Sequence, residues 1–212
     1  MKIEDLICTV DKIYGVQDDR LYDLEDHFYY ERKFLLRYTQ SAKKEYKMQN
    51  LVISLAWFLG AMKRFHIDLD KELFKRYPYK CPFCLGLPCV CESAETQDKK
   101  TQKVGRPTSR PPKTINDWQN LALKIYPNDN LQLINKELFF AQDKSHYLFR
   151  SFRRTLGKTK IKEIANGAAD YFMIILRLFN LLGKDLSREF KYYFGKGCYI
   201  CHKSPCQCYY FE

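Results

Sequence analysis

The most constraining feature of this chain is a cysteine pattern that occurs twice. The spacing C-x2-C-x4-C-x-C, with a proline before the third cysteine, is formed by Cys81, Cys84, Cys89 and Cys91 and again by Cys198, Cys201, Cys206 and Cys208. Four thiolates complete the tetrahedral coordination of a zinc ion, and the C-x2-C and C-x-C pairs each supply two of them. We therefore predict two zinc ions, one in each cluster.

The alternatives to structural zinc follow from the same residues. Eight of the nine cysteines belong to the clusters, and in a reducing compartment such short spacings are typical of metal sites rather than disulfides. Four sulfur ligands leave no open coordination position, so we expect a structural and not a catalytic ion. An iron–sulfur cluster is the alternative occupant, and His202 is the alternative ligand in the second cluster. Cys8 lies outside both clusters and is expected to be a small core residue.

The sequence upstream of each cluster also repeats. An offset of 117 residues aligns Asp68-Leu69 with Asp185-Leu186, and an offset of 112 aligns Lys12-Ile13-Tyr14 with Lys124-Ile125-Tyr126. The five extra residues (117 − 112) are expected between positions 153 and 162, because loops absorb insertions at small thermodynamic cost. We predict a tandem duplication with a first unit at 1–91, a flexible basic linker at 92–113 and a second unit at 114–212.

Apolar residues recur at helical spacing in both units, and no stretch alternates with the period of a strand. The predicted first helices begin at the N-caps Asp5 and Asp117. The remaining helices are expected at about 21–39, 45–64 and 68–76, and at about 131–152, 161–182 and 185–193. The predicted fold class is all-α: two bundles, each ending in a zinc knuckle, packed together as an intramolecular pseudo-dimer.

One run in the second unit resembles a known family. The segment DYFMIILRLFNLLGKDL, from Asp170 to Leu186, is similar to the third-helix signature of the MazG-type all-α nucleoside triphosphate pyrophosphohydrolases. That signature begins with aspartate and ends in an asparagine, an apolar pair, glycine and Asp-Leu. The likeness extends over about a hundred residues of the second half at the level of helix order, and more weakly over the first half.

The resemblance implies a magnesium site. In that family Glu-x-x-Glu and Glu-x-x-Asp on successive helices hold Mg²⁺, which takes hard oxygen ligands and bridges the triphosphate. The matching candidates here are Glu137, Glu163 and Asp170 in the second unit. The pattern is incomplete, because Gly167 stands where a glutamate is expected and Ile53 replaces the aspartate in the first unit.

Charge supports more than one function. The chain carries 36 Lys and Arg against 25 Asp and Glu, a net charge of +11, which attracts polyanions. The first hypothesis is a diverged MazG-like nucleotide-binding protein that hydrolyses nucleoside triphosphates with Mg²⁺ in the second unit. The alternative is a non-enzymatic, zinc-stabilised helical module that binds nucleic acid or an acidic protein partner. Basic and aromatic residues mix at 43–47 and 150–160, and Tyr209-Tyr210-Phe211 offers an apolar contact for a protein.

The sequence also bears on location. Its longest nearly uncharged apolar stretch, Leu51 to Met62, is too short to cross a bilayer, and the N-terminus lacks the apolar run of a secretion signal. We therefore expect a cytoplasmic protein without membrane association.

Overall fold

The computed structural model describes residues 1–91, 110–127, 133–155 and 161–208, and these contain eight α-helices and no strand. The all-α prediction is confirmed for this part of the chain. The helices are α1 (Ile3–Leu21), α2 (Leu24–Gln40), α3 (Lys44–Arg64), α4 (Leu69–Arg76), α5 (Ile115–Ile125), α6 (Leu133–Thr155), α7 (Ile161–Leu181) and α8 (Leu186–Phe194). Most of the predicted linker, residues 156–160 of the predicted insertion between 153 and 162, and Tyr209-Tyr210-Phe211 lie outside the described residues.

Carboxylates at the helix starts satisfy backbone N–H groups that have no partner within the helix. Asp68 and Asp185 are the N-caps of α4 and α8, as predicted, and accept from the third residue of each helix. Asp5 and Asp117 are not N-caps. They lie three residues later, where their side chains accept from the backbone N–H of the N-caps Lys2 and Thr114. The prediction was off by most of a turn because aspartate is favourable at both positions of a capping box.

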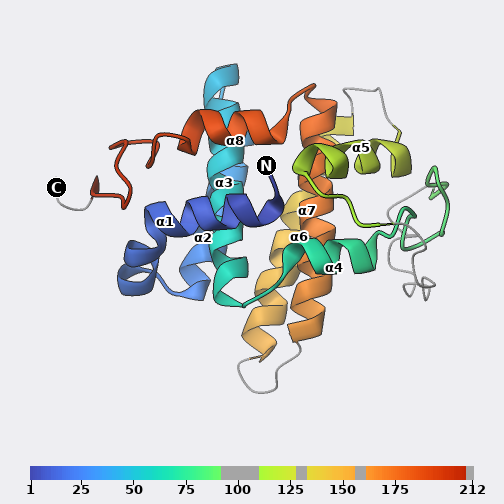
Figure 1. The fold of residues 1–212 in the computed structure, drawn as a ribbon, viewed down its shortest axis with the longest axis horizontal. Helices are drawn as coiled ribbons and strands as arrows, with labels where there is room; N and C mark the ends of the chain where they lie inside the picture. Colours follow the sequence, from blue (N-terminus) through green and yellow to red (C-terminus); the bar gives the residue numbers. More distant parts are fainter. Residues whose placement is uncertain (92–109, 128–132, 156–160, 209–212) are drawn as a thin grey trace.

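The long helices α3 and α7 stand at the centre of the molecule (Figure 1), and each carries a long neighbour, α2 on α3 and α6 on α7. The short helices cross between the halves: α4 packs on α7, and α8 packs on α3. The buried apolar side chains of both halves form one core. Each half therefore depends on the other for part of its burial.

A buried carboxyl group lies where α2, α3, α6 and α7 meet. Glu31 is only 1% exposed, and it accepts hydrogen bonds from the hydroxyls of Tyr171, at 2.5 Å, and Ser145. Ser54 donates to the Glu31 backbone carbonyl at 2.9 Å. Burial raises the pKa of Glu31 to about 7, although the hydroxyls of Ser145 and Tyr171 oppose the shift.

Replacing Glu31 by glutamine should remove a pH dependence of stability. Unfolded, Glu31 ionises near its ordinary pKa of 4.5, whereas the folded chain keeps the proton until about pH 7. The folded state thus binds the proton more tightly, so stability falls as pH rises from 4.5 to 7 and stays lower above. As the pH rises from about 5.5 to 8, the free energy of unfolding of Glu31→Gln, measured with urea, should increase by roughly 2 kcal/mol relative to that of wild type. The exposed Glu45→Gln is the control, and equal pH profiles for wild type and Glu31→Gln would contradict the assignment.

Two further findings complete the fold. Cys8 is exposed, contrary to the prediction of a core residue, because Leu6, Val10 and Ile13 form the buried stripe of α1 and Cys8 lies off it. Among the described residues, no helix combines the length and the apolar character that crossing a membrane requires.

Candidate functional site

The eight predicted cysteine ligands come together as two groups of four. In each group all four sulfur atoms lie within 4.8 Å of one another. Two pairs are 3.8 and 3.7 Å apart in the first group, and two are 3.6 and 3.9 Å apart in the second. A tetrahedral ion with metal–sulfur bonds of about 2.3 Å requires sulfur–sulfur edges of about 3.8 Å. The geometry therefore fits one tetrahedral metal ion in each group.

The two cysteine loops have the same backbone path. In the first, the N–H of Cys81 donates to the Gly86 carbonyl at 3.1 Å; in the second, the N–H of Cys198 donates to the Lys203 carbonyl at 2.9 Å. Leu85 and His202 occupy the same place in each loop with a positive φ, at 59° and 56°. His202 is exposed and does not belong to the sulfur group, so the geometry favours four cysteine ligands.

Backbone amides prepare the sulfur atoms for a cation. The N–H of Gln207 donates to Cys201 at 3.4 Å and is the main cause that lowers the pKa of this thiol to about 6. Burial raises the pKa of Cys206, 3.9 Å away, to about 11. Four adjacent sulfurs cannot all be charged without a neutralising cation. Thiolate donors of this kind select zinc over Mg²⁺ or Ca²⁺, so the chemistry of the site agrees with the predicted ion.

Each cysteine loop is attached to the first helix of the other half. The N–H of Cys89 donates to the Ile125 carbonyl at the end of α5, and that of Cys206 donates to the Ile13 carbonyl on α1, both at 2.7 Å. The Tyr126 hydroxyl lies 3.6 Å from the sulfur of Cys81. A metal ion that fixes the loops thus also fixes the contact between the halves.

The predicted magnesium ligand Asp170 is held by cations of the chain itself. Arg76 of α4 binds both carboxylate oxygens, at 2.8 and 2.9 Å, and the Tyr77 hydroxyl donates to one of them at 2.8 Å. Lys144 of α6 lies 3.6 Å away, and the Asp170 side chain is 6% exposed. The negative charge that would attract Mg²⁺ is already compensated.

Glu137 is also buried and paired. Its Oε1 atom lies 2.5 Å from Arg177 of α7, whose guanidinium is 4.0 Å from the ring centre of Tyr126. Burial raises the pKa of Glu137, and the charge of Arg177 opposes that shift. Glu137 therefore joins α6 and α7 to the end of α5 and, through Tyr126, to the first cysteine group.

The structure does not bring the three predicted carboxylates together. Glu163 is half-buried two turns before Asp170 on α7, and these residues with Glu137 do not form a group within 4.8 Å. The packing around Gly167 explains why the glutamate of the family's pattern is missing at this position. A Cβ atom there would lie 2.9 Å from Leu148 Cδ2 and 3.2 Å from ring carbons of Tyr147, so α6 occupies the space that a longer side chain needs.

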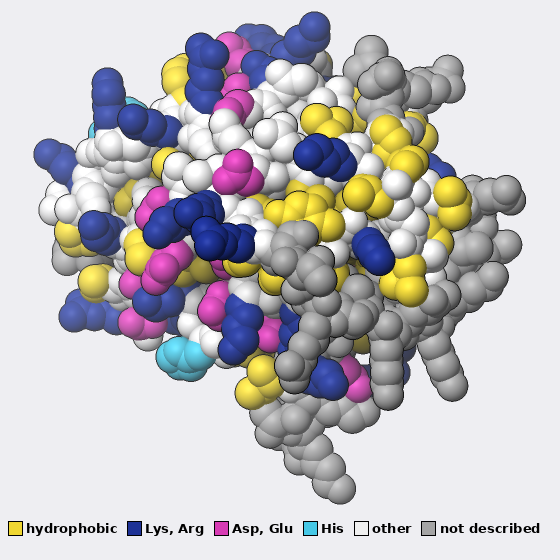
Figure 2. All heavy atoms as spheres, turned by 45° about the vertical axis from the view of Figure 1, so that its right-hand side comes forward, with side chains coloured by type: hydrophobic (Ala, Val, Ile, Leu, Met, Phe, Trp, Pro, Cys, Tyr) yellow, Lys and Arg dark blue, Asp and Glu magenta, His cyan; other side chains and the backbone are white. Residues whose placement is uncertain are grey.

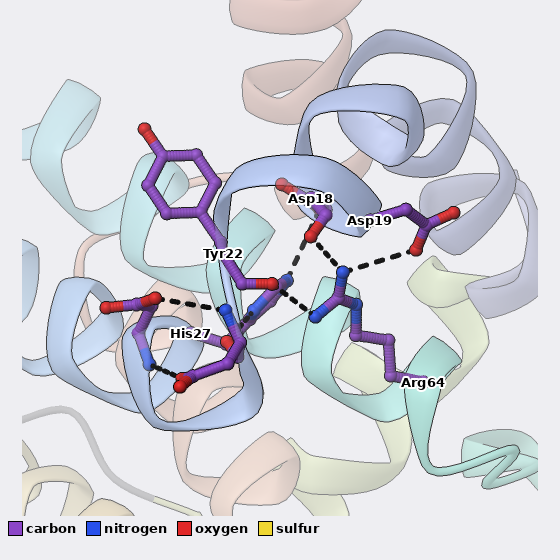
Figure 3. A network of polar contacts seen from close by, with 7 residues as sticks. Asp18, Asp19, Tyr22, His27 and Arg64 are labelled. Carbon is purple, nitrogen blue, oxygen red and sulfur yellow. Dashed lines mark hydrogen bonds and ion pairs between the residues drawn. The ribbon is translucent and has the colours of Figure 1, made fainter.

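Sequence reasoning missed a polar clamp at the turn between α1 and α2 (Figure 3). The fully buried His27 binds Asp18 at 3.3 Å and the Asp23 carbonyl at 2.8 Å. Arg64 of α3 donates to the carbonyls of Asp18 and Tyr22. Close packing supports the clamp, because a Cβ at Gly60 would lie 3.0 Å from the His27 ring. No spacing motif marks these residues, since their contacts join three helices.

Comparison with family models, with curated proteins and with solved structures finds no match to this chain.

Proposed function

We propose that this chain is a non-enzymatic, zinc-stabilised helical module that binds nucleic acid. The observation that carries the proposal is a set of five cations on α2 and at the start of α3, which we call the basic strip. It consists of Lys33, Arg37, Lys43, Lys44 and Lys47. None of the five makes an ion pair within the described parts of the chain. Uncompensated Lys and Arg side chains are what a phosphate backbone requires.

The strip also carries aromatic rings. Lys33 lies 5.1 Å from the ring centre of Tyr30, and Arg37 lies 5.2 Å from that of Phe34. Cations mixed with aromatic side chains are typical of surfaces that bind single strands, because the cations hold phosphates and the rings stack on bases. On the face drawn in Figure 2, Lys and Arg side chains lie among Asp and Glu side chains. The local arrangement, rather than the net charge of +11, therefore supports the strip as the contact.

The acidic residues argue for binding without hydrolysis. Arg76 holds both oxygens of Asp170, and Arg177 lies against Glu137. A magnesium ion at Asp170 would have to displace a guanidinium that makes two hydrogen bonds, and it would find no second carboxylate at Gly167. Nucleoside triphosphate hydrolysis remains a prediction of the sequence resemblance, with less support from this geometry.

We further propose that the chain arose as a tandem duplication of a MazG-like helical unit and acts as an intramolecular pseudo-dimer with two structural zinc ions. Support comes from reciprocal contacts: α4 packs on α7, while α8 packs on α3. The carbonyls that accept from the cysteine loops, Ile13 and Ile125, are the positions that the sequence repeat aligns. The loss of Asp170's counterpart in the first unit, where Ile53 stands, fits a unit that only supports the other.

Removing charge from the strip should weaken binding of a single-stranded RNA of about 12 nucleotides, a length within the usual site sizes. The test variant combines Lys33→Ala, Arg37→Ala and Lys43→Ala. If each residue neutralises one phosphate, the slope of log affinity against log salt should fall by roughly 2. The matched control removes three cations elsewhere, by Lys71→Ala, Lys124→Ala and Lys184→Ala. Fluorescence anisotropy at several salt concentrations measures the RNA affinity of both triple variants. Equal slopes for the two would contradict the basic strip as the RNA contact.

A further inference from the structure

A cavity of about 220 Å³ lies between α1, α2, α3 and the second cysteine loop. Sites for drug-sized ligands begin at roughly 300 Å³, so this cavity suits a single ring system. Aromatic side chains dominate its lining, from Tyr14, Tyr22, Tyr30, Phe34, Trp57, Phe194 and Tyr199. The cavity lies beside the basic strip, because the lining residues Tyr30 and Phe34 contact Lys33 and Arg37.

The rings form two separate groups. In the first, Tyr30 is stacked on Trp57 at 4.7 Å and 19°, and Tyr22 stands edge-on to both at 5.1 to 5.6 Å. In the second, Phe194 contacts Tyr14 and Tyr199 edge-on, at 6.1 and 6.2 Å. No ring contact joins the two groups in the part of the chain that the structure describes. A planar ligand that enters between them can contact aromatic surface from both groups.

Both groups are held in place. The first is anchored by the clamp of Figure 3, in which Arg64 binds the backbone carbonyl of Tyr22 and His27 binds Asp18. The second includes Tyr199, which lies between the cysteine ligands of the second loop. The pocket is therefore largely formed before a ligand arrives, which lowers the entropic cost of binding.

Polar groups in the pocket are few. Asp18 is a lining residue, and its carboxylate, one oxygen of which lies 3.3 Å from His27, is a group that accepts from amino or imino groups such as those on base edges. The Tyr14 hydroxyl is buried and lies beside Cys198, yet it makes no hydrogen bond of normal geometry. These groups offer one acceptor and one unused hydroxyl to a polar ring.

Positive charge lies beside two of the lining rings. Lys33 is 5.1 Å from the ring centre of Tyr30, and Arg37 is 5.2 Å from that of Phe34. Aromatic pockets also bind quaternary ammonium ions, but neighbouring cations repel such a ligand and attract phosphate. The observations therefore favour a base attached to a phosphate backbone.

From these observations we infer that one base of a single-stranded nucleic acid inserts into this pocket, while its neighbouring phosphates lie on Lys33 and Arg37. The inference rests on the proposed nucleic-acid binding and deepens it by naming the base site. A strand is favoured over a free nucleotide because the basic strip carries three further cations besides Lys33 and Arg37.

The test compares two RNA strands of about 12 nucleotides, one with all bases and one with abasic ribose at every position. Both are titrated against the full-length, zinc-loaded chain. We expect the abasic strand to bind roughly 10-fold more weakly. Tyr30→Ala should weaken binding of the intact strand by roughly 10-fold and leave the abasic strand unchanged. Tyr192→Ala, a tyrosine that is 78% exposed on α8, is the matched control and should bind both strands as wild type does.

A melting curve for each variant establishes that it is folded, and Tyr199→Ala provides a second test from the other ring group. If both strands bind equally well and neither variant distinguishes them, the base pocket is wrong while the proposed strip survives. If neither strand binds, the proposed function fails as well. Binding of a trimethyl-lysine peptide in place of RNA, or competition by a free mononucleotide at the same concentration as the strand, would also overturn the inference.

Discussion

Removal of the metal from both cysteine groups is expected to eliminate most of the chain's stability. A ligand present at about 1,000 times its dissociation constant stabilises the folded state by roughly 4 kcal/mol per site. Two such sites amount to about 8 kcal/mol, within the range of 5 to 15 kcal/mol that is typical of a whole domain. The effect should extend beyond the loops, because Cys89 and Cys206 join each loop to the first helix of the other half.

The measurement is thermal unfolding with and without a strong chelator, combined with metal analysis. We expect two zinc ions per chain and a melting temperature that falls by more than about 10 °C after chelation. Cys81→Ser and Cys198→Ser should each lower the zinc content to one ion. Cys8→Ser is the control, because Cys8 is exposed and outside both groups. An unchanged melting temperature after complete zinc removal would contradict the structural role.

Replacing Asp170 by asparagine should destabilise the fold strongly instead of abolishing an enzymatic activity. The substitution removes the carboxylate that Arg76 binds through two hydrogen bonds, at a site where the Arg76 side chain is 11% exposed. Breaking such a buried pair costs about 3 kcal/mol or more. For a chain of this size that corresponds to a fall in melting temperature of roughly 6 to 12 °C. Asp143 on α6 is exposed, so Asp143→Asn is the matched control and should change the melting temperature little.

A double-mutant cycle separates the ion pair from other effects of the substitution. Arg76→Met alone should also destabilise, since it leaves the Asp170 carboxylate buried with Tyr77 and Lys144 only. The double variant Arg76→Met/Asp170→Leu should cost less than the sum of Arg76→Met and Asp170→Leu measured singly, because neither half of the ion pair is left facing an apolar side chain. Additive losses would mean that Arg76 and Asp170 do not depend on each other.

The helices were predictable because their signals are local. The central helix was predicted at 161–182 and observed as Ile161–Leu181, where apolar residues cover nearly every face. The cysteine groups were predictable for a similar reason, since all four ligands lie within 11 residues and their spacing fixes the loop. Asp68 and Asp185 capped the expected helices because an N-cap acts on the residues that follow it directly.

The pairing of the acidic residues was not predictable from the sequence. Asp170 meets Arg76 across 94 positions of the chain, and Glu31 meets Tyr171 across 140. Such contacts follow from the crossing of α4 onto α7 and of α2 toward α6, and no periodicity encodes them. Asp170 therefore has the spacing of a metal ligand in the family that the sequence resembles, but in this structure its partner is Arg76. The exposure of Cys8 was missed because cysteine is usually buried, and only the apolar stripe of α1 reveals which side it faces.

The most direct test of the account is a crystal structure determined in the presence of Mg²⁺ and a non-hydrolysable nucleoside triphosphate, with anomalous data at the zinc edge. We expect two zinc peaks, each surrounded by four cysteine sulfurs, and Arg76 still bound to Asp170 with no ion beside it. A divalent ion held by Glu137, Glu163 and Asp170, with Arg76 displaced and the triphosphate bound to that ion, would contradict the account and establish a catalytic centre.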